Sequence, residues 1–182
     1  MTQPVLRTAR TELRVARITD AKAVLAYRLE NRAHLAPWEP LRDEGYYTLE
    51  GARTSIVQWS SVSRAGVAWP FCIFDPGTGR VMGSFTFANI VRGVFQAAHL
   101  GYGLAAEWQG QGIMAEALRA GLDYAFGPLD LHRVMANYMP RNERSGKLLE
   151  KLGFEREGMA RGYLKIHGVW EDHVLTSKVR AD

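Results

Sequence analysis

The sequence predicts a mixed α/β domain with one sheet of about seven strands flanked by about four helices. Three observations lead to this fold class. Apolar residues recur with the alternation, or in the short runs, typical of strands. Amphipathic segments that begin at capping residues lie between these runs. A glycine-rich segment, 109–112, joins one strand to a helix, the connection that parallel strands require. With 182 residues, the chain is expected to form one domain, 1–182.

In chain order, Leu13–Ile18 alternates apolar and polar residues and is predicted as the first strand. A helix over Ala21–Arg32 follows, with Thr19-Asp20 as its capping residues. Two prolines in His34–Pro40 exclude regular structure there. A second helix is predicted from about Thr48 to Arg64. The inward-facing positions of the two helices are expected to be Ala23, Val24, Tyr27, Leu29, Ala52, Ile56, Val57 and Trp59.

Strands come next, in hairpins. Ala68–Asp75 and Arg80–Ala88 flank Pro76–Gly79, a strong turn signal. Arg92-Gly93 is a second turn, and it leads to an apolar strand over Ala97–Leu104. This strand runs into the glycine-rich segment, so the parallel step of the sheet is expected here.

The last third of the chain alternates between helices and strands. A helix over Ala115–Phe126 ends at Gly127-Pro128. A strand, Arg133–Tyr138, precedes a short helix, Ser145–Leu152. Two final strands are predicted around a His167-Gly168 turn; they cover Phe154–Tyr163 and Val169–Lys178.

Composition excludes several classes of protein. Hydrophobic residues make up 47% and charged residues 23%, values that are ordinary for a globular protein in water. No apolar run approaches the length of a membrane span, and the N-terminal residues lack the core of a signal peptide. Cys72 is the single cysteine and lies in an apolar run, so it is expected in the core. These features favour the cytoplasm. The net charge of +4 is spread along the chain, and the histidines have no ligand spacing, so neither sequence-specific nucleic-acid binding nor a metal site is expected.

The segment Gln109–Met114 carries the clearest functional signal. Glycines between a strand and a helix N-terminus allow an anion to approach unpaired backbone N–H groups. No Lys or Arg lies between Gln109 and Glu116, so backbone donors would have to hold the anion. The segment matches neither a dinucleotide-binding loop nor a P-loop, and an ordinary turn fits the same glycines. A second polar segment, Asn142–Ser145, stands before the last helix, with Asn142 as its cap.

Together, these two segments resemble the GNAT family of acetyl-CoA-dependent N-acetyltransferases. Gln109 and Gly112 match the loop of that family, whereas Met114 stands where Gly or Ala is usual. Asn142 and Ser145, followed by Gly153-Phe154, match its second motif. Within the family the chain is similar to the RimJ/RimL subgroup, in which a methionine is usual at this position. The strings that carry this likeness are Leu35–Pro40, Asn89–Gly93, Leu100–Tyr102, Trp108–Met114, His132–Pro140 and Trp170–Val174.

The resemblance implies the GNAT fold, a mostly antiparallel sheet that is splayed at the acetyl-CoA site. It also implies that loop amides hold the CoA pyrophosphate and that a strand end pairs with the pantetheine arm. On this basis, the residues expected to contact acetyl-CoA are Tyr102, Gly103, Leu104, Gln109, Gly110, Gln111, Gly112, Ile113, Met114 and Asn142.

Catalytic and acceptor residues also follow from the resemblance. Ser145 would assist the leaving thiolate, although helix capping is its alternative role. His99 is the candidate general base, because it lies where other members of the family place a glutamate. A lone histidine in a strand is, however, often structural. Trp38 would line the pocket for the acceptor amine, or it would only pack the irregular loop against the core. Glu39 would bind the positively charged peptide terminus.

The implied reaction is acetyl transfer to the N-terminal alanine of a small-subunit ribosomal protein, number five, with association with the ribosome. No metal is expected. Two alternatives stay open at this point. The first is a GNAT acetyltransferase for a small amine, such as a polyamine, an amino acid or an aminoglycoside. The second is a CoA-binding module of ribosome assembly.

Overall fold

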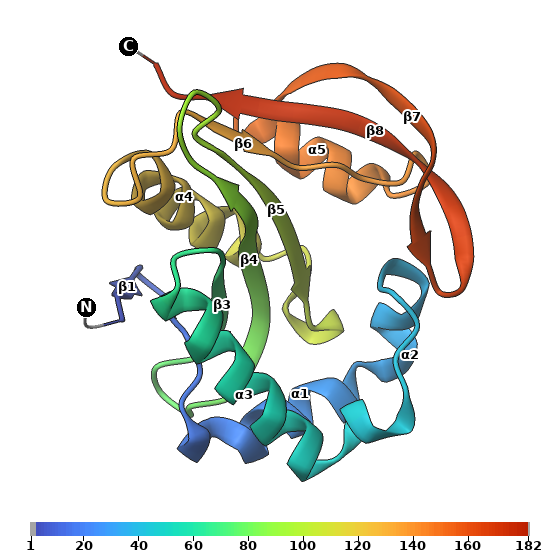
Figure 1. Cartoon of the computed structure of the whole chain (residues 1–182). Helices are drawn as coiled ribbons and strands as arrows, with labels where there is room; N and C mark the ends of the chain where they lie inside the picture. Colours follow the sequence, from blue (N-terminus) through green and yellow to red (C-terminus); the bar gives the residue numbers. More distant parts are fainter. Residues whose placement is uncertain (1–2, 182) are drawn as a thin grey trace.

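A computed structural model describes residues 3–181 and places one eight-stranded sheet at the centre of the molecule (Figure 1). The strand order is β1-β2-β3-β4-β5-β6-β8-β7. Only the β5–β6 pair is parallel within the described residues, as the glycine-rich connection predicts. The strands are β1 (Val5–Arg7), β2 (Glu12–Arg14), β3 (Trp69–Phe74), β4 (Val81–Val91), β5 (Ala97–Leu104), β6 (Arg133–Met135), β7 (Glu155–Ile166) and β8 (Val169–Val179).

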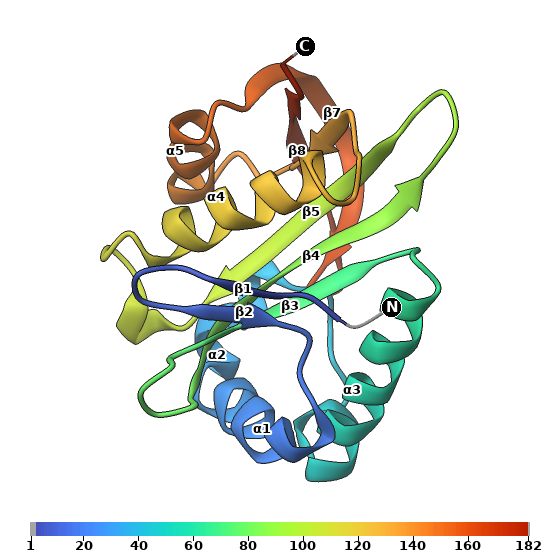
Figure 2. The same cartoon turned by 90° about the vertical axis from the view of Figure 1, so that its left-hand side faces the viewer.

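Helices cover both faces of the sheet (Figure 2). Those on one face are α1 (Ala21–Glu30), α2 (Arg32–Leu35) and α3 (Leu49–Arg64). Those on the other face are α4 (Ile113–Phe126) and α5 (Glu143–Lys151). Short 3-10 turns occur at η1 (Ile18–Asp20), η2 (Ala36–Trp38), η3 (Glu44–Tyr47) and η4 (Ala106–Trp108). The mixed fold class is confirmed, with one strand more than predicted, because β1 is too short to give a period-2 signal.

The predicted strand Leu13–Ile18 is shorter in the structure and ends at Arg14. The cause is Asp20, whose carboxylate accepts hydrogen bonds from the Arg17 backbone N–H and from Arg14, each at 2.6 Å. These bonds turn the chain into η1 and leave Asp20 without a side-chain capping bond to α1.

The region 31–40 is more regular than predicted. The first helix ends at Glu30 because the buried Asn31 uses its side chain elsewhere. Its amide donates to the Tyr27 carbonyl at 2.9 Å, and its oxygen accepts from the Ala106 N–H at 3.0 Å. The chain then forms α2 and η2 across the segment expected to be irregular. Pro37 fits because it occupies the first turn of η2, where its missing N–H costs nothing.

Helix burial agrees with the predicted pattern at most positions. Val24, Ala52 and Ile56 are buried, and the Thr48 side chain caps α3 by accepting from the Gly51 N–H. Leu29 and Val57 were expected to face inward, but they are 51% and 63% exposed. Each follows a buried residue, Arg28 and Ile56 respectively, and lies at the edge of the buried stripe of its helix.

The core on the α4 side is built from aromatic residues of the central strands. Phe71, Phe85 and Phe87 are at most 1% exposed, and the Phe71 and Phe85 rings stack at 5.0 Å. Gly121 of α4 lies directly over Phe85, where a Cβ would come within 2.7 Å of the ring. This close approach fixes α4 on the sheet, and it therefore fixes the loop that precedes α4. Cys72 is buried on the opposite face, as expected.

The sheet opens between β5 and β6. Their pairing covers only Ala97–His99 on β5 and ends at His99 opposite Met135. The predicted strand Arg133–Tyr138 is therefore shorter, and Tyr138 makes only an isolated bridge to Val174 of β8. Residues Leu100–Leu104 of β5 continue along β4 with no strand on their other edge within the described residues. This open edge is the splay that the family resemblance implies.

Candidate active site

The glycine-rich loop joins β5 to α4 through η4 and is exposed. Gly110 and Gly112 have φ angles of +75° and +78°, which residues other than glycine rarely adopt. An added Cβ at Gly110 would meet nothing within 4 Å, so the space beside this turn is open. The Glu116 N–H is the first in the helix to bond a carbonyl, that of Gly112, at 3.0 Å. The Gln109 N–H donates to the Ala106 carbonyl at 3.2 Å, whereas within residues 3–181 the N–H groups of residues 110–115 have no protein acceptor. They are therefore available to an anion.

The polar side chains and one carbonyl of the loop are already bound elsewhere. The Gln111 amide donates to the Glu107 carbonyl at 2.7 Å, and the Gln111 carbonyl accepts from Arg10 at 2.9 Å. Gln109 accepts from Arg144 of α5, and its amide nitrogen lies 2.9 Å from Nε2 of His34. The loop is therefore held from both sides, and its backbone donors remain as the free polar groups.

Ile113 and Met114 begin α4, and their side chains are buried in the core. Only their backbone N–H groups face the loop. The methionine at a position where the family usually has Gly or Ala is therefore a packing residue, and it leaves the donor array of the helix N-terminus unchanged.

The open edge of β5 contains the three strand residues that the sequence singles out. An added Cβ at Gly103 would lie 3.6 Å from the Tyr27 hydroxyl, on the face that α1 covers. Leu104 is buried, and its carbonyl lies 3.2 Å from Nε2 of His34. Tyr102 points to the other face of the sheet, toward α5. The strand therefore presents main-chain groups along the splay and side chains to both faces.

Tyr102 and Ser145 meet beside the splay. Their hydroxyl oxygens are 2.7 Å apart. Burial raises the pKa of Tyr102 to about 12, and the hydrogen bond with Ser145 opposes part of that rise. The Asn142 side chain caps α5 by accepting from the Ser145 backbone N–H at 3.2 Å. The cap thus uses the backbone N–H of Ser145, and the Ser145 hydroxyl contacts Tyr102.

His99 lies at the last paired position of β5, where the splay begins. Its Nδ1 atom is buried and has no hydrogen-bond partner among the described residues. Desolvation lowers the pKa of this imidazole, which favours its neutral form. A neutral histidine can accept a proton.

Trp38 is the last residue of η2, and Glu39 is its C-cap. Burial raises the pKa of Glu39, and this effect exceeds the opposing influence of Arg42 and Arg28. The Glu39 carbonyl accepts from the His167 N–H at 2.9 Å, which connects η2 to the tip of the β7–β8 hairpin. Trp38 is 37% exposed, and the Arg141 guanidinium carbon lies 5.6 Å from the centroid of its ring.

Arg141 completes this connection. It forms an ion pair with Glu171 of β8 at 2.7 Å and donates to the Pro37 carbonyl at 3.3 Å. Contacts therefore join the α2–η2 segment to the β7–β8 hairpin through Glu39 and Arg141, and to β5 through His34 and the Leu104 carbonyl; the three elements can be located in Figure 1.

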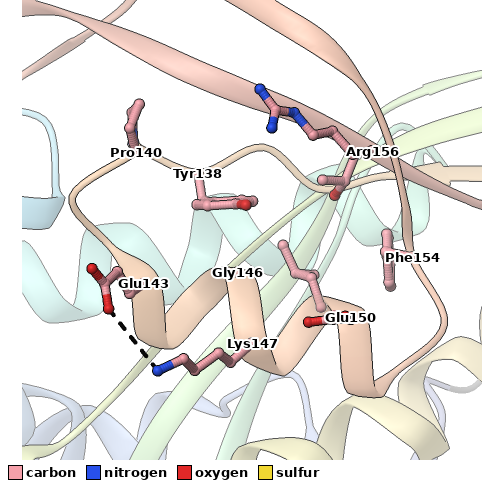
Figure 3. Close-up of a pocket in the computed structure, with 10 residues that line it drawn as sticks. Tyr138, Pro140, Glu143, Gly146, Lys147, Glu150, Phe154 and Arg156 are labelled. Atoms are coloured by element: carbon pink, nitrogen blue, oxygen red, sulfur yellow. Dashed lines mark ion pairs between the residues drawn. The ribbon is translucent and has the colours of Figure 1, made fainter.

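A separate cavity of about 450 Å³ lies between α5 and β7 (Figure 3). Tyr138, Phe154 and Arg156 line it, together with Glu143 and Lys147, which form a 4.0 Å ion pair. None of the residues predicted to contact acetyl-CoA, to take part in catalysis or to bind the acceptor borders this cavity. It therefore lies apart from the predicted site.

Two other features are absent from residues 3–181. The acidic, histidine and cysteine side chains form no group of three that could hold a metal ion. No helix is long and apolar enough to cross a membrane.

Several site residues were missed from the sequence. Arg10 and His34 reach the glycine-rich loop from more than seventy positions away in the chain. Arg144 and Arg141 stand beside a recognised motif, but their partners lie on other elements. No local pattern in the sequence identifies such contacts, because they depend on how the sheet folds.

Comparisons with known proteins agree with this geometry. Residues 10–155 match the model of the family described as the Acetyltransferase (GNAT) domain. The chain is 44% identical over 177 residues to the [Ribosomal protein uS5]-alanine N-acetyltransferase of Escherichia coli, covering 97% of this chain and 91% of the relative. The crystal structure of the ribosomal-protein-S5-alanine acetyltransferase from Vibrio fischeri has a TM-score of 0.93 and 40% identity, and covers 98% of each chain. RimJ of Mycobacterium smegmatis, solved in complex with CoA-disulfide, has a TM-score of 0.89 and 32% identity, covering 97% of this chain and 86% of that one.

Proposed function

The chain belongs to the GNAT acetyltransferase family, and on that premise we propose that it acetylates the N-terminal α-amine of a ribosomal protein with acetyl-CoA. The acceptor we propose is the N-terminal alanine of ribosomal protein uS5, the substrate named for the Escherichia coli and Vibrio fischeri relatives.

One observation carries the proposal: the exposed donor loop and the open edge of β5 are continuous. The loop offers unpaired N–H groups to a pyrophosphate, and Leu100–Leu104 offer main-chain groups to an amide-containing arm. Gly101 adds no side chain to this edge, and the space beside it is open, because an added Cβ would meet nothing within 4 Å. The residues present therefore fit acetyl-CoA, which would supply the acetyl group as an activated thioester.

The acceptor amine must be neutral in order to attack. A terminal α-amine has an ordinary pKa of about 7.7–8.0, so part of it is neutral near pH 7 without a strong base. As the new C–N bond forms, the amine loses a proton; as the C–S bond breaks, the departing sulfur gains one. The overall products are the acetylated N-terminus and CoA.

Ser145 is the residue we assign to the departing sulfur, as the proton donor. Its hydroxyl is held 2.7 Å from that of Tyr102 and is not used in the helix cap. Tyr102 has a raised pKa and remains protonated, so it can in turn donate to Ser145. His99, neutral at the mouth of the splay, is the candidate proton acceptor for the amine.

On the acceptor side, Trp38 and Glu39 are proposed to contact the peptide terminus. The His167 N–H donates to the Glu39 carbonyl, and Arg141 contacts both the Pro37 carbonyl and Glu171, so this segment is held against the β7–β8 hairpin.

We further propose that residues 1–182 act as one acetyltransferase domain in the cytoplasm, in association with the ribosome and without reading a nucleic-acid sequence. Cosedimentation with small ribosomal subunits at rising salt would test the association. A complex that survives only at low salt would indicate charge attraction rather than a dedicated interface.

The function is tested by mass spectrometry of a uS5-derived peptide that begins with alanine, incubated with acetyl-CoA and the purified protein. A gain of about 42 Da, the mass of one acetyl group, is expected on the free peptide and not on a copy with a blocked terminus. Spermidine and an aminoglycoside serve as competing acceptors. Faster transfer to either of them would contradict the proposed acceptor and leave the family assignment in place.

A further inference from the structure

The turn between β1 and β2 lies beside the start of α4, as Figure 2 shows for the blue hairpin. Arg10 stands in this turn. Its backbone N–H donates to Glu116 at 3.0 Å, and its Nε donates to the same carboxylate at 2.8 Å. One Nη group donates to the Gln111 carbonyl at 2.9 Å. Arg10 therefore binds both the loop and the first turn of the helix that follows it.

These contacts compensate for two groups near the loop that carry partial or full negative charge, the Gln111 carbonyl and the Glu116 carboxylate, both of which would repel an anion. The Gln111 carbonyl carries partial negative charge, and Arg10 holds it by a hydrogen bond. Glu116 carries full negative charge within the first turn of α4, close to the free N–H groups. The Thr8 side chain and then Arg10 hold the pKa of Glu116 below its ordinary value, so this carboxylate stays ionised, and Arg10 balances its charge in a 2.7 Å ion pair.

Arg10 also brings a positive charge to the loop itself. The segment 109–116 contains no Lys or Arg. One Arg10 Nη nitrogen lies 3.6 Å from the point that a Cβ would occupy at Gly112. The cation that the loop lacks in sequence is thus supplied from a hairpin about a hundred residues away.

We propose that Arg10 is a positioning residue for the pyrophosphate of CoA: it fixes the loop with its N–H groups outward and neutralises Glu116. This inference rests on the proposed use of acetyl-CoA. An alternative role for the same contacts is a structural tie between the hairpin and α4. The two roles differ in whether the effect of Arg10 depends on a phosphate in the ligand.

The test is calorimetric titration of the purified protein with CoA and with pantetheine, which has the same arm without the pyrophosphate or the nucleotide. Arg10→Ala is expected to raise the Kd for CoA about tenfold, as the loss of a charge-assisted interaction would. The Kd for pantetheine should not change. Arg7→Ala is the matched control, because Arg7 lies in the same hairpin but pairs with Glu12.

A second variant separates neutralisation from simple anchoring. In Arg10→Ala/Glu116→Gln the unpaired carboxylate is gone, so part of the affinity for CoA is expected to return. A structural tie would give no such recovery, because the double variant lacks both halves of the tie. The pair is partly exposed, and such pairs contribute little to stability, so both variants should fold.

Two results would overturn the inference while leaving the proposed function intact: wild-type affinity for CoA in Arg10→Ala, or an equal loss for CoA and pantetheine. If the wild-type protein binds no CoA at all, the proposed function itself fails.

Discussion

Ser145 has two roles in the structure that can be separated by substitution. Its backbone N–H belongs to the cap of α5, whereas its hydroxyl contacts Tyr102. Ser145→Ala removes only the hydroxyl. We expect kcat to fall about a hundredfold, within the usual range for loss of a general acid, while the KM for acetyl-CoA changes little.

The control for Ser145 is Ser55→Ala, which removes a helix serine hydroxyl bonded to the Gly51 carbonyl on α3, away from the splay. Its kcat should equal that of the wild type. An unchanged kcat in Ser145→Ala would show that the Ser145 hydroxyl takes no part in the transfer.

The raised pKa of Glu39 leads us to expect that the stability of the folded protein depends on pH. The Glu39 pKa is raised in the folded state, so the folded protein binds this proton more readily than the unfolded chain does. Ionisation of Glu39 therefore costs stability as the pH rises through the ordinary glutamate range, about 4, and above. Glu39→Gln removes this cost.

The Glu39→Gln variant is expected to raise Tm at pH 7 by about 1–3 °C. The gain should shrink toward pH 4 and vanish once the wild-type carboxyl is protonated. Thermal unfolding followed by circular dichroism across this range measures it. A lower Tm in the variant at pH 7 would mean that the Arg42 ion pair outweighs burial.

At the scale of elements, the loop before α4 requires left-handed backbone. Gly110 has a φ of +75°, and alanine in that region costs about 1 kcal/mol. Gly66, which follows α3, has a φ of +70° and equally open space, so Gly66→Ala is a matched control. Both variants should lose about 1 kcal/mol of unfolding free energy.

Only Gly110→Ala is expected to raise the KM for acetyl-CoA as well, because its Cβ would stand beside the free N–H groups. Steady-state kinetics on both variants would measure the difference. Equal KM values would remove this turn from the cofactor site.

The contact between α4 and the sheet gives a second prediction at this scale. Alanine normally favours a helix over glycine by about 1 kcal/mol. At Gly121, however, the new Cβ would lie 2.7 Å from the Phe85 ring. Gly121→Ala is therefore expected to lose about 1–3 kcal/mol in urea unfolding, as overpacked cores do.

Adding Phe85→Leu should recover part of that loss, because the smaller side chain makes room for the methyl group. If Gly121→Ala proves stabilising, the fit of α4 on Phe85 is looser than the structure indicates.

At the scale of the whole molecule, the sheet has two parts, strands β1–β5 and strands β6–β8, which are joined by a narrow seam between β5 and β6. Only three residue pairs connect β5 to β6, and Leu100–Leu104 extend beyond them with one open edge. Hydrogen exchange should therefore show fast-exchanging amides on this edge in the free protein. Added CoA is expected to slow them, together with those of 109–115, and to leave β1 and β2 unchanged. Uniform slowing across the chain would contradict a ligand bound along this edge.

Much of this architecture can be predicted from the sequence, because strand alternation, turn residues and helix caps are local signals. The capped helix that begins after Thr48 and the His167-Gly168 turn are examples. Three-residue strands such as β1 give no such signal. The break at Asn31 also escapes prediction, since its cause is a hydrogen bond to Ala106, far along the chain.

The candidate site divides in the same way. The loop and the Asn142–Ser145 segment are short motifs, so their residues can be named from the sequence. The Tyr102 hydroxyl, Arg10 and Arg141 act through contacts between distant elements. From the sequence, Tyr102 is predicted to contact the cofactor only through its backbone, and neither Arg10 nor Arg141 is predicted to belong to the site.

The narrow seam also bears on how the chain is made. Within residues 3–181, strands β1–β5 pair only with one another apart from the three-residue contact with β6, and all of them precede residue 105. A growing chain can therefore close this antiparallel ladder before the remainder has been translated. The face that carries Phe71 and Phe85 stays bare until α4 emerges to cover it. The unfinished polypeptide is thus most exposed to aggregation between the completion of its fifth strand and the arrival of that helix, and a chaperone would be of most use in this interval.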